Sequence, residues 1–103
     1  LNQGGPVFAD TNNMIILDVR TPEEFSDTHI QGAKNYDIFS ANFKDQISKL
    51  DKNKTYKVYC RSGNRSGQAE QLMKSMGFKD VENIGSVAEA ARRLNKKCNG
   101  KTC

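Results

Sequence analysis

Short apolar segments alternate with stretches of helical period along this sequence, and that alternation limits the folds open to it. Residues 14–19 are a continuous run rich in β-branched side chains, too short for a helix and suited to a strand covered on both faces. Residues 55–59 and 81–84 have the composition of two more strands. Strands joined by helices at this spacing imply right-handed crossovers. We therefore predict a small α/β domain with a parallel sheet and helices on both faces.

The predicted helices have recognisable starts. Thr21 can cap a short helix in which Pro22 takes the first position and Glu24 completes a capping box. Ser86 and Glu89 form a second capping box. Apolar residues at helical spacing predict three longer helices, over residues 40–50, 66–76 and 86–94. Between the first helix and these, residues 29–36 are expected to turn into another extended segment.

The length of 103 residues corresponds to a single domain. We place its core at about residues 14–94, followed by a basic, cysteine-containing tail over residues 95–103. The net charge of +4 is densest over residues 92–101, without interleaved aromatics, so we predict a solvated tail and no nucleic-acid partner. The longest apolar run, residues 14–17, is too short to cross a bilayer, and we expect a monomer with no membrane span.

Three cysteines are present, Cys60, Cys98 and Cys103, and this odd number without a C-x-x-C pair excludes a disulfide framework as the main source of stability. Cys98 and Cys103 close a short loop that can oxidise outside the cytoplasm and would stay reduced in a cytosol. A zinc site built from the cysteines and His29 fits no common ligand spacing. We therefore expect no metal and no cofactor.

Cys60 follows the strand predicted at residues 55–59, and ligands of open parallel sheets bind beyond such strand ends. Small residues after it let the backbone curl so that amide groups face the sulfur, and a helix N-terminus and two arginines add positive charge. These surroundings lower the pKa of a thiol. An inert buried cysteine is the alternative, and the cationic loop argues against it. We predict Cys60 as the nucleophile and a substrate-binding loop made of Arg61, Ser62, Gly63, Asn64, Arg65 and Ser66.

Asp18 and Arg20 end the first strand and open onto the same rim as supporting residues of the site. Arg20 is either a substrate contact or a salt-bridge partner of Glu23 or Glu24, with Asp18 bonding loop amides; we favour the second interpretation. His29 is either a general base or a hydrogen-bonded corner residue. We favour the corner role, because an ionised thiol needs no base.

Several segments together resemble a single-domain rhodanese. The matching residues are L-D-V-R-T-P-E-E-F at 17–25, H-I-Q-G-A at 29–33, V-Y-C-R-S-G-N-R-S at 58–66 and G-F-K-D-V-E-N-I-G at 77–85. A further resemblance, to periplasmic thiosulfate sulfurtransferases of the phage-shock-protein-E type, rests on V-Y-C at 58–60, S-G-Q-A at 66–69 and V-E-N at 81–83. The resemblance implies that Cys60 takes a sulfur from thiosulfate as a persulfide and passes it to cyanide or a thiol, with small molecules as its partners. It also implies a periplasmic location, with the cytoplasm as the alternative.

Two other functions share these features. Cysteine phosphatases and arsenate reductases also present a thiolate in an arginine-closed loop, but their signature has five residues between cysteine and arginine where this chain has four, Arg61 to Asn64. The second alternative is a sulfane-sulfur carrier or binding module loaded by a partner protein. The cationic loop does not separate an enzyme from such a carrier.

Overall fold

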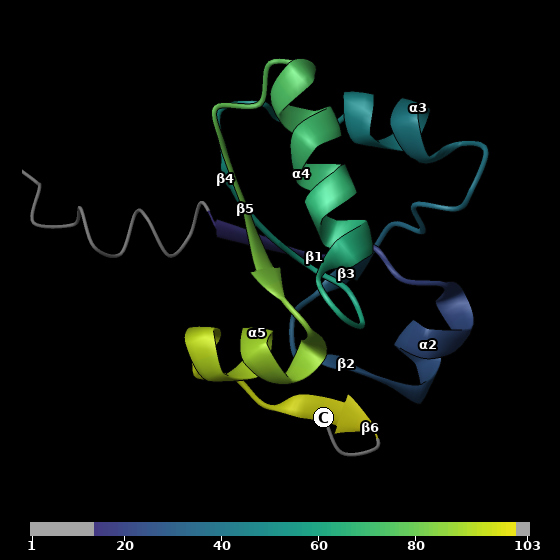
Figure 1. Cartoon of the computed structure of the whole chain (residues 1–103), viewed down its shortest axis with the longest axis vertical. Helices are drawn as coiled ribbons and strands as arrows, with labels where there is room; N and C mark the ends of the chain where they lie inside the picture. The colour runs from purple at the N-terminus through teal and green to yellow at the C-terminus, as the bar shows by residue number, and fades with distance from the viewer. Residues whose placement is uncertain (1–13, 101–103) are drawn as a thin grey trace, which may run out of the picture.

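A four-stranded parallel sheet forms the centre of the computed structural model, which describes residues 14–100 (Figure 1). In spatial order the strands are β3 (Lys34–Asn35), β1 (Met14–Asp18), β4 (Thr55–Tyr59) and β5 (Asp80–Gly85). The helices around it are α2 (Pro22–Asp27), α3 (Phe43–Ser48), α4 (Asn64–Ser75) and α5 (Val87–Leu94). All three strand pairings are parallel, which confirms the predicted α/β class.

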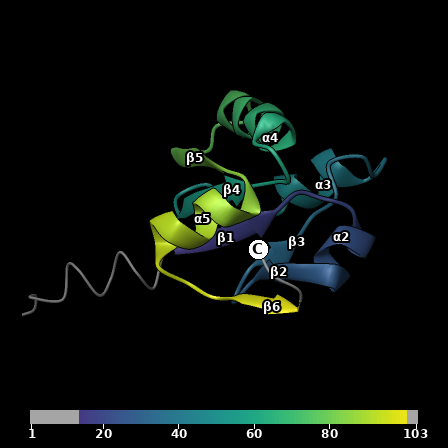
Figure 2. The same cartoon turned by 60° about the horizontal axis from the view of Figure 1, so that its bottom comes forward.

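Side chains of the central strands alternate between two cores, one on each face of the sheet. On β1, Leu17 points into the core formed with α3 and α4, whereas Ile16 points into the core formed with α5. On β4, Val58 belongs to the core with α3 and α4, and Tyr59 belongs to the core with α5. This period of two is the geometry of a strand buried on both faces. The two views show α4 and α5 as separate layers on the sheet (Figure 1, Figure 2).

The helix boundaries follow from the predicted caps. Both capping boxes are present, because the Thr21 hydroxyl accepts from the amide of Glu24 and the Ser86 hydroxyl accepts from the amide of Glu89. Gly77, at φ +98°, ends the longest helix, α4, in the left-handed region that glycine adopts without strain. Among residues 14–100 no helix is long and apolar enough to cross a membrane.

The segment after α5 differs from the predicted solvated tail. Cys98–Gly100 form strand β6, which pairs antiparallel with β2 (Thr28–Ile30) in a second, two-stranded sheet (Figure 2). Partly buried Cys98 packs against the core beneath α5. The polar sequence gives no strand pattern here, so the strand depends on the partner that the fold brings alongside it. Cys98 is disulfide-bonded, and Cys103 lies outside the described residues.

Candidate active site

Cys60 lies where β4 ends, as the sequence predicts, at the carboxyl edge of the sheet. Its amide donates to the carbonyl of Gly85 at the end of β5, over 3.1 Å. Its side chain belongs to the core between the sheet and α4, and the residue is 0% exposed. The sulfur is thus held between two strand ends and covered by the loop that follows it.

Hydrogen-bond donors surround the sulfur of Cys60. The amide of Gly63 donates to Sγ over 2.9 Å, and the hydroxyl oxygen of Ser66 lies 3.3 Å from it. Burial raises the pKa of the Cys60 thiol, but bonds from the Ser66 hydroxyl and from the amides of Ser66, Ser62 and Gly63 outweigh it and leave the pKa below its ordinary value. The predicted cradle of inward-facing amides is present, and it favours the thiolate.

Gly63 gives the loop its curvature. Its φ is +96°, and it is the residue that precedes the first turn of α4. A β-carbon there would lie 3.4 Å from the Cα of Gly85, within ordinary van der Waals contact of the end of β5. The left-handed backbone is what requires glycine here, because other residues adopt it only with strain.

We expect Gly63→Ala to lower the free energy of unfolding by about 1–2 kcal/mol, the cost of a left-handed non-glycine residue. It should also slow the reaction of Cys60 with a small alkylating reagent at neutral pH, because the Gly63 amide no longer points squarely at Sγ. Gly32→Ala is the matched control, since Gly32 also has a positive φ, +86°, and open space around its α-carbon. Denaturant unfolding and alkylation rates check both variants. Equal alkylation rates in the two variants would contradict the role of Gly63.

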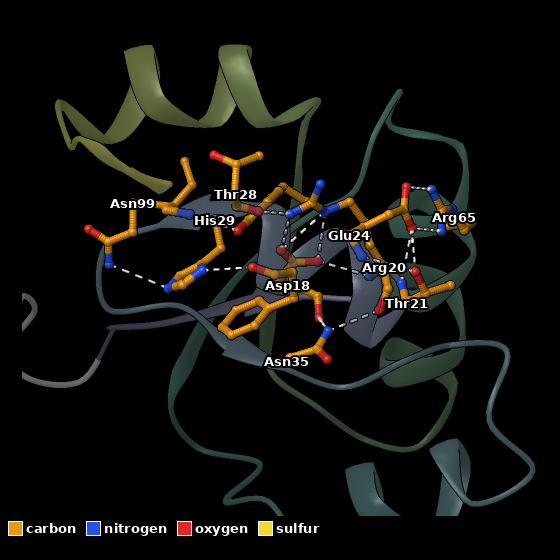
Figure 3. A network of polar contacts seen from close by, with 12 residues as sticks. Asp18, Arg20, Thr21, Glu24, Thr28, His29, Asn35, Arg65 and Asn99 are labelled. Atoms are coloured by element: carbon orange, nitrogen blue, oxygen red, sulfur yellow. Dashed lines mark hydrogen bonds and ion pairs between the residues drawn. The ribbon is translucent and has the colours of Figure 1, made fainter. Parts of the chain in front are cut away.

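Arg65 is bound by a carboxylate instead of being free to meet a substrate. Its guanidinium donates to both oxygens of Glu24, over 2.8 and 3.0 Å (Figure 3). It also lies 5.4 Å from the centre of the Phe39 ring. Phe39 is 69% exposed. Arg61, by contrast, is exposed, and no hydrogen bond or ion pair holds it within residues 14–100. Of the two arginines of the loop, Arg61 is therefore the one whose guanidinium no described residue engages.

The other predicted residues of the substrate-binding loop differ in their exposure. Ser62 and Asn64 are exposed, Gly63 is half-buried, and Ser66 is fully buried. The structure thus brings the amides of Ser62, Gly63 and Ser66 to the sulfur. Asn64 is the first residue of α4, and within residues 14–100 its exposed side chain makes no hydrogen bond, so its predicted role in binding substrate stays a prediction.

The Glu24–Arg65 pair should make the free energy of unfolding depend on pH in the acid range. The hydrogen bond from Arg65 lowers the pKa of Glu24 from 4.5 to about 2, helped by the Thr21 amide and opposed by burial. A depressed folded-state pKa gives stability that is present above pH 4.5 and is lost as the pH falls towards about 2. We expect Glu24→Gln to remove this contribution of about 1 kcal/mol. The measurement is the difference in unfolding free energy between variant and wild type against pH, with the exposed neighbour Glu23→Gln as the control. A difference that does not change over this range would contradict the assignment.

Asp18 and Arg20 form a buried pair with each other, so the expected bridge from Arg20 to Glu23 or Glu24 is corrected (Figure 3). Arg20 donates from Nε and Nη2 to the two carboxylate oxygens of Asp18, at 2.7 Å for the shortest contact, and its amide donates to the same carboxylate. Nη2 also donates to the carbonyl of Thr28. Asp18 is 0% and Arg20 4% exposed. Glu24, one of the two predicted partners, is bound instead by Arg65, which follows it by 41 residues.

His29 has the contacts of a corner residue. Its ring stacks on that of Phe25, with centroids 3.9 Å apart, and its Nδ1 lies 2.9 Å from the Phe25 carbonyl. The other ring nitrogen lies 3.4 Å from the side-chain nitrogen of Asn99 on β6. These contacts hold α2, β2 and β6 together and include no residue of the Cys60 loop. They support the corner role over that of a general base.

Sequence reasoning missed one residue of the site, Asn83 on β5. Its side-chain amide contacts both Gly63 and Ser66, although it is 17 residues from Ser66 in the chain. A polar residue near the end of a predicted parallel strand was the available signal, because such strand ends meet at the rim where Cys60 lies.

Comparison with known proteins agrees with this geometry. The model of the rhodanese-like domain matches residues 8–92, and the chain belongs to that family. It is 40% identical over 86 residues to the thiosulfate sulfurtransferase PspE of Escherichia coli, covering 84% of this chain and 80% of that protein. It is 36% identical over 69 residues to the putative sulfur carrier protein YrkF of Bacillus subtilis, covering 67% of this chain and 36% of that protein. A solved rhodanese with anions from E. coli superposes with a TM-score of 0.65 at 38% identity, covering 74% of this chain and 89% of that one.

Proposed function

We propose that this protein is a thiosulfate sulfurtransferase that carries the transferred sulfur as a persulfide on Cys60. Membership of the rhodanese-like family and the similarity to PspE support sulfur transfer in general. The single observation that supports the persulfide is the set of donors directed at Sγ, with the Gly63 amide at 2.9 Å. Such preorganised donors stabilise a sulfur anion without reorganising during the reaction.

In the first step the Cys60 thiolate attacks the outer sulfur of thiosulfate. A bond forms between Sγ and that sulfur, the sulfur–sulfur bond of thiosulfate breaks, and its electron pair leaves with sulfite. In the second step cyanide or a thiolate attacks the outer sulfur of the persulfide and regenerates the thiolate; with cyanide the product is thiocyanate. This is covalent catalysis in two displacements, and no proton has to be taken from an already ionised thiol.

Access to the sulfur sets a requirement on this mechanism. Because Cys60 is 0% exposed, a donor reaches Sγ only when part of the loop moves aside. Arg61 and Ser62 are the exposed residues next to it in the chain, so displacement of these two opens the shortest route. The guanidinium of Arg61, which has no ion pair with any of the described residues, then offers the anionic donor a first contact, and Arg65 stays with Glu24.

The ion pair between Arg65 and Glu24 argues against a phosphatase activity. Phosphate chemistry on a cysteine needs a guanidinium that closes over the oxyanion, and here Arg65 is engaged on two sides, by Glu24 and by the Phe39 ring. Hydrolysis of an aryl phosphate that disappears in Cys60→Ser would reverse this preference.

Intact mass spectrometry after thiosulfate treatment tests the proposal. We expect the wild-type mass to rise by one sulfur atom, cyanide to remove that atom, and Cys60→Ala never to acquire it. An unchanged wild-type mass would contradict the persulfide.

A sulfane-sulfur carrier is the second candidate, favoured by the similarity to YrkF and by the buried sulfur of Cys60. Catalytic turnover distinguishes a sulfurtransferase from a sulfur carrier. Steady production of thiocyanate from thiosulfate and cyanide supports the enzyme. A chain that is loaded by a partner protein, and that forms no thiocyanate by itself, is a carrier.

We also infer an oxidising compartment, the periplasm, for this protein. The bonded state of Cys98 supports it, because disulfides persist outside the cytoplasm and are reduced inside it. Trapping of free thiols by an alkylating reagent during extraction from the native cells is the test, and a fully alkylated Cys98 would indicate the cytoplasm.

A further inference from the structure

Asn83 contacts the Cys60 loop through both ends of its side-chain amide. Nδ2 donates to the carbonyl of Gly63 over 2.9 Å, and Oδ1 accepts from the amide of Gly85 over 3.0 Å. Only the nitrogen can donate to a carbonyl and only the oxygen can accept from an amide, so these two bonds fix the orientation of the group. The carbonyl oxygen of Asn83 is consequently the atom that faces Ser66.

The hydroxyl of Ser66 lies between two acceptors. Its Oγ is 2.7 Å from Oδ1 of Asn83 and 3.3 Å from Sγ of Cys60. A hydroxyl has one hydrogen, and Oδ1 has none to give, so the short contact requires that Ser66 donates to Asn83. In that state the lone pairs of Oγ face the sulfur and accept the hydrogen of a neutral thiol. The bond from the hydroxyl to Sγ that lowers the pKa of Cys60 forms only when the hydroxyl turns towards the sulfur.

We propose that Asn83 is a positioning residue that acts on Cys60 through Ser66, by holding the Ser66 hydroxyl hydrogen away from the sulfur for as long as the thiol is protonated. When the thiol ionises, its proton passes to solvent and the hydroxyl turns from Oδ1 to donate to Sγ. Ionisation therefore costs the bond between Ser66 and Asn83. Asn83 therefore keeps the thiol less acidic than the amides and a Ser66 hydroxyl without this bond would make it.

The charged groups around the sulfur are separate from this arrangement. Arg65 on α4 is paired with Glu24 on α2, and Asp18 at the end of β1 is paired with Arg20. None of these four is joined by a hydrogen bond or ion pair to Ser66 or Asn83 in the described part of the chain. A substitution at Asn83 thus changes the hydroxyl without removing a charge near the sulfur.

The test is the pH dependence of alkylation of Cys60 in the full chain, read from the mass of its peptide. The inference rests on Cys60 as the reactive thiol of the proposed function, but this readout uses no sulfur donor. In Asn83→Leu, which is similar in size and has no acceptor, we expect the midpoint to fall by up to about one pH unit, because ionisation no longer costs the neutral hydrogen bond between Ser66 and Asn83. Asn83→Ala should also lower the midpoint, and it replaces the leucine variant if that variant does not fold.

A second variant separates positioning from loosening of the loop. In a Ser66→Ala background, Asn83→Leu should leave the midpoint unchanged, because the hydroxyl through which Asn83 acts is absent. Asn35→Leu removes another side chain that bonds two backbone carbonyls, those of Asp18 and Arg20, and should not move the midpoint. A midpoint that rises or stays constant in Asn83→Leu, or that falls equally in the Ser66→Ala background, overturns the proposal. Failure of wild type to form thiocyanate while the predicted shifts are seen contradicts the sulfurtransferase and leaves this inference standing.

Discussion

Replacing Cys60 by serine is expected to reduce sulfur transfer from thiosulfate to cyanide by about 10⁴-fold or more, the scale on which removal of a covalent nucleophile acts. The serine hydroxyl keeps nearly the shape of the thiol, but it is not ionised near neutral pH and cannot form a persulfide. The measurement is the initial rate of thiocyanate formation, with the fold of the variant checked by circular dichroism.

Cys98→Ser is the matched control, because Cys98 is the other cysteine within residues 14–100. Cys98 lies on β6 and packs on the face of the sheet covered by α5, whereas Cys60 belongs to the opposite core. We therefore expect Cys98→Ser to retain transfer, although loss of its disulfide will lower stability. More than a tenth of the wild-type rate in Cys60→Ser would show that this sulfur is not the carrier of the reaction.

The second large effect concerns stability. We expect Asp18→Ala to lower the free energy of unfolding by about 3–5 kcal/mol, because it leaves the guanidinium of Arg20 buried without its counter-charge. The side chains of Asp18 and Arg20 are 0% and 5% exposed, so water cannot replace the lost carboxylate without opening the corner. Equilibrium unfolding in urea gives the value.

Two comparisons make this prediction specific. Asp45→Ala breaks the exposed pair with Lys49 and should cost less than about 1 kcal/mol. The double variant Asp18→Leu with Arg20→Met should recover most of the loss, since apolar groups of similar volume need no partner. Equal effects of Asp18→Ala and Asp45→Ala would show that burial of the pair does not matter.

The fold was largely predictable because its determinants are local. The apolar run of β1 and the two capping boxes, at Thr21 and Ser86, act over a few residues, and each appears in the structure where the sequence indicates it. β6 was not predictable, because its residues carry no strand pattern and pair with β2, 70 positions away for His29 and Asn99. Long-range pairing decides such a strand, and the sequence contains no local trace of it.

The candidate site divides in the same way. The sequence alone determined that Cys60 follows a strand and precedes a glycine-containing loop and a helix. The signals for this order, which are strand composition, turn residues and helical period, are all local in the sequence. Only the tertiary structure decided the partners of the charged and polar groups: Asp18 for Arg20, Glu24 for Arg65 and Asn83 for Ser66. Each of these choices depends on which atoms come within about 3 Å of one another, and that distance is set by the packing of strands and helices that are far apart in the chain.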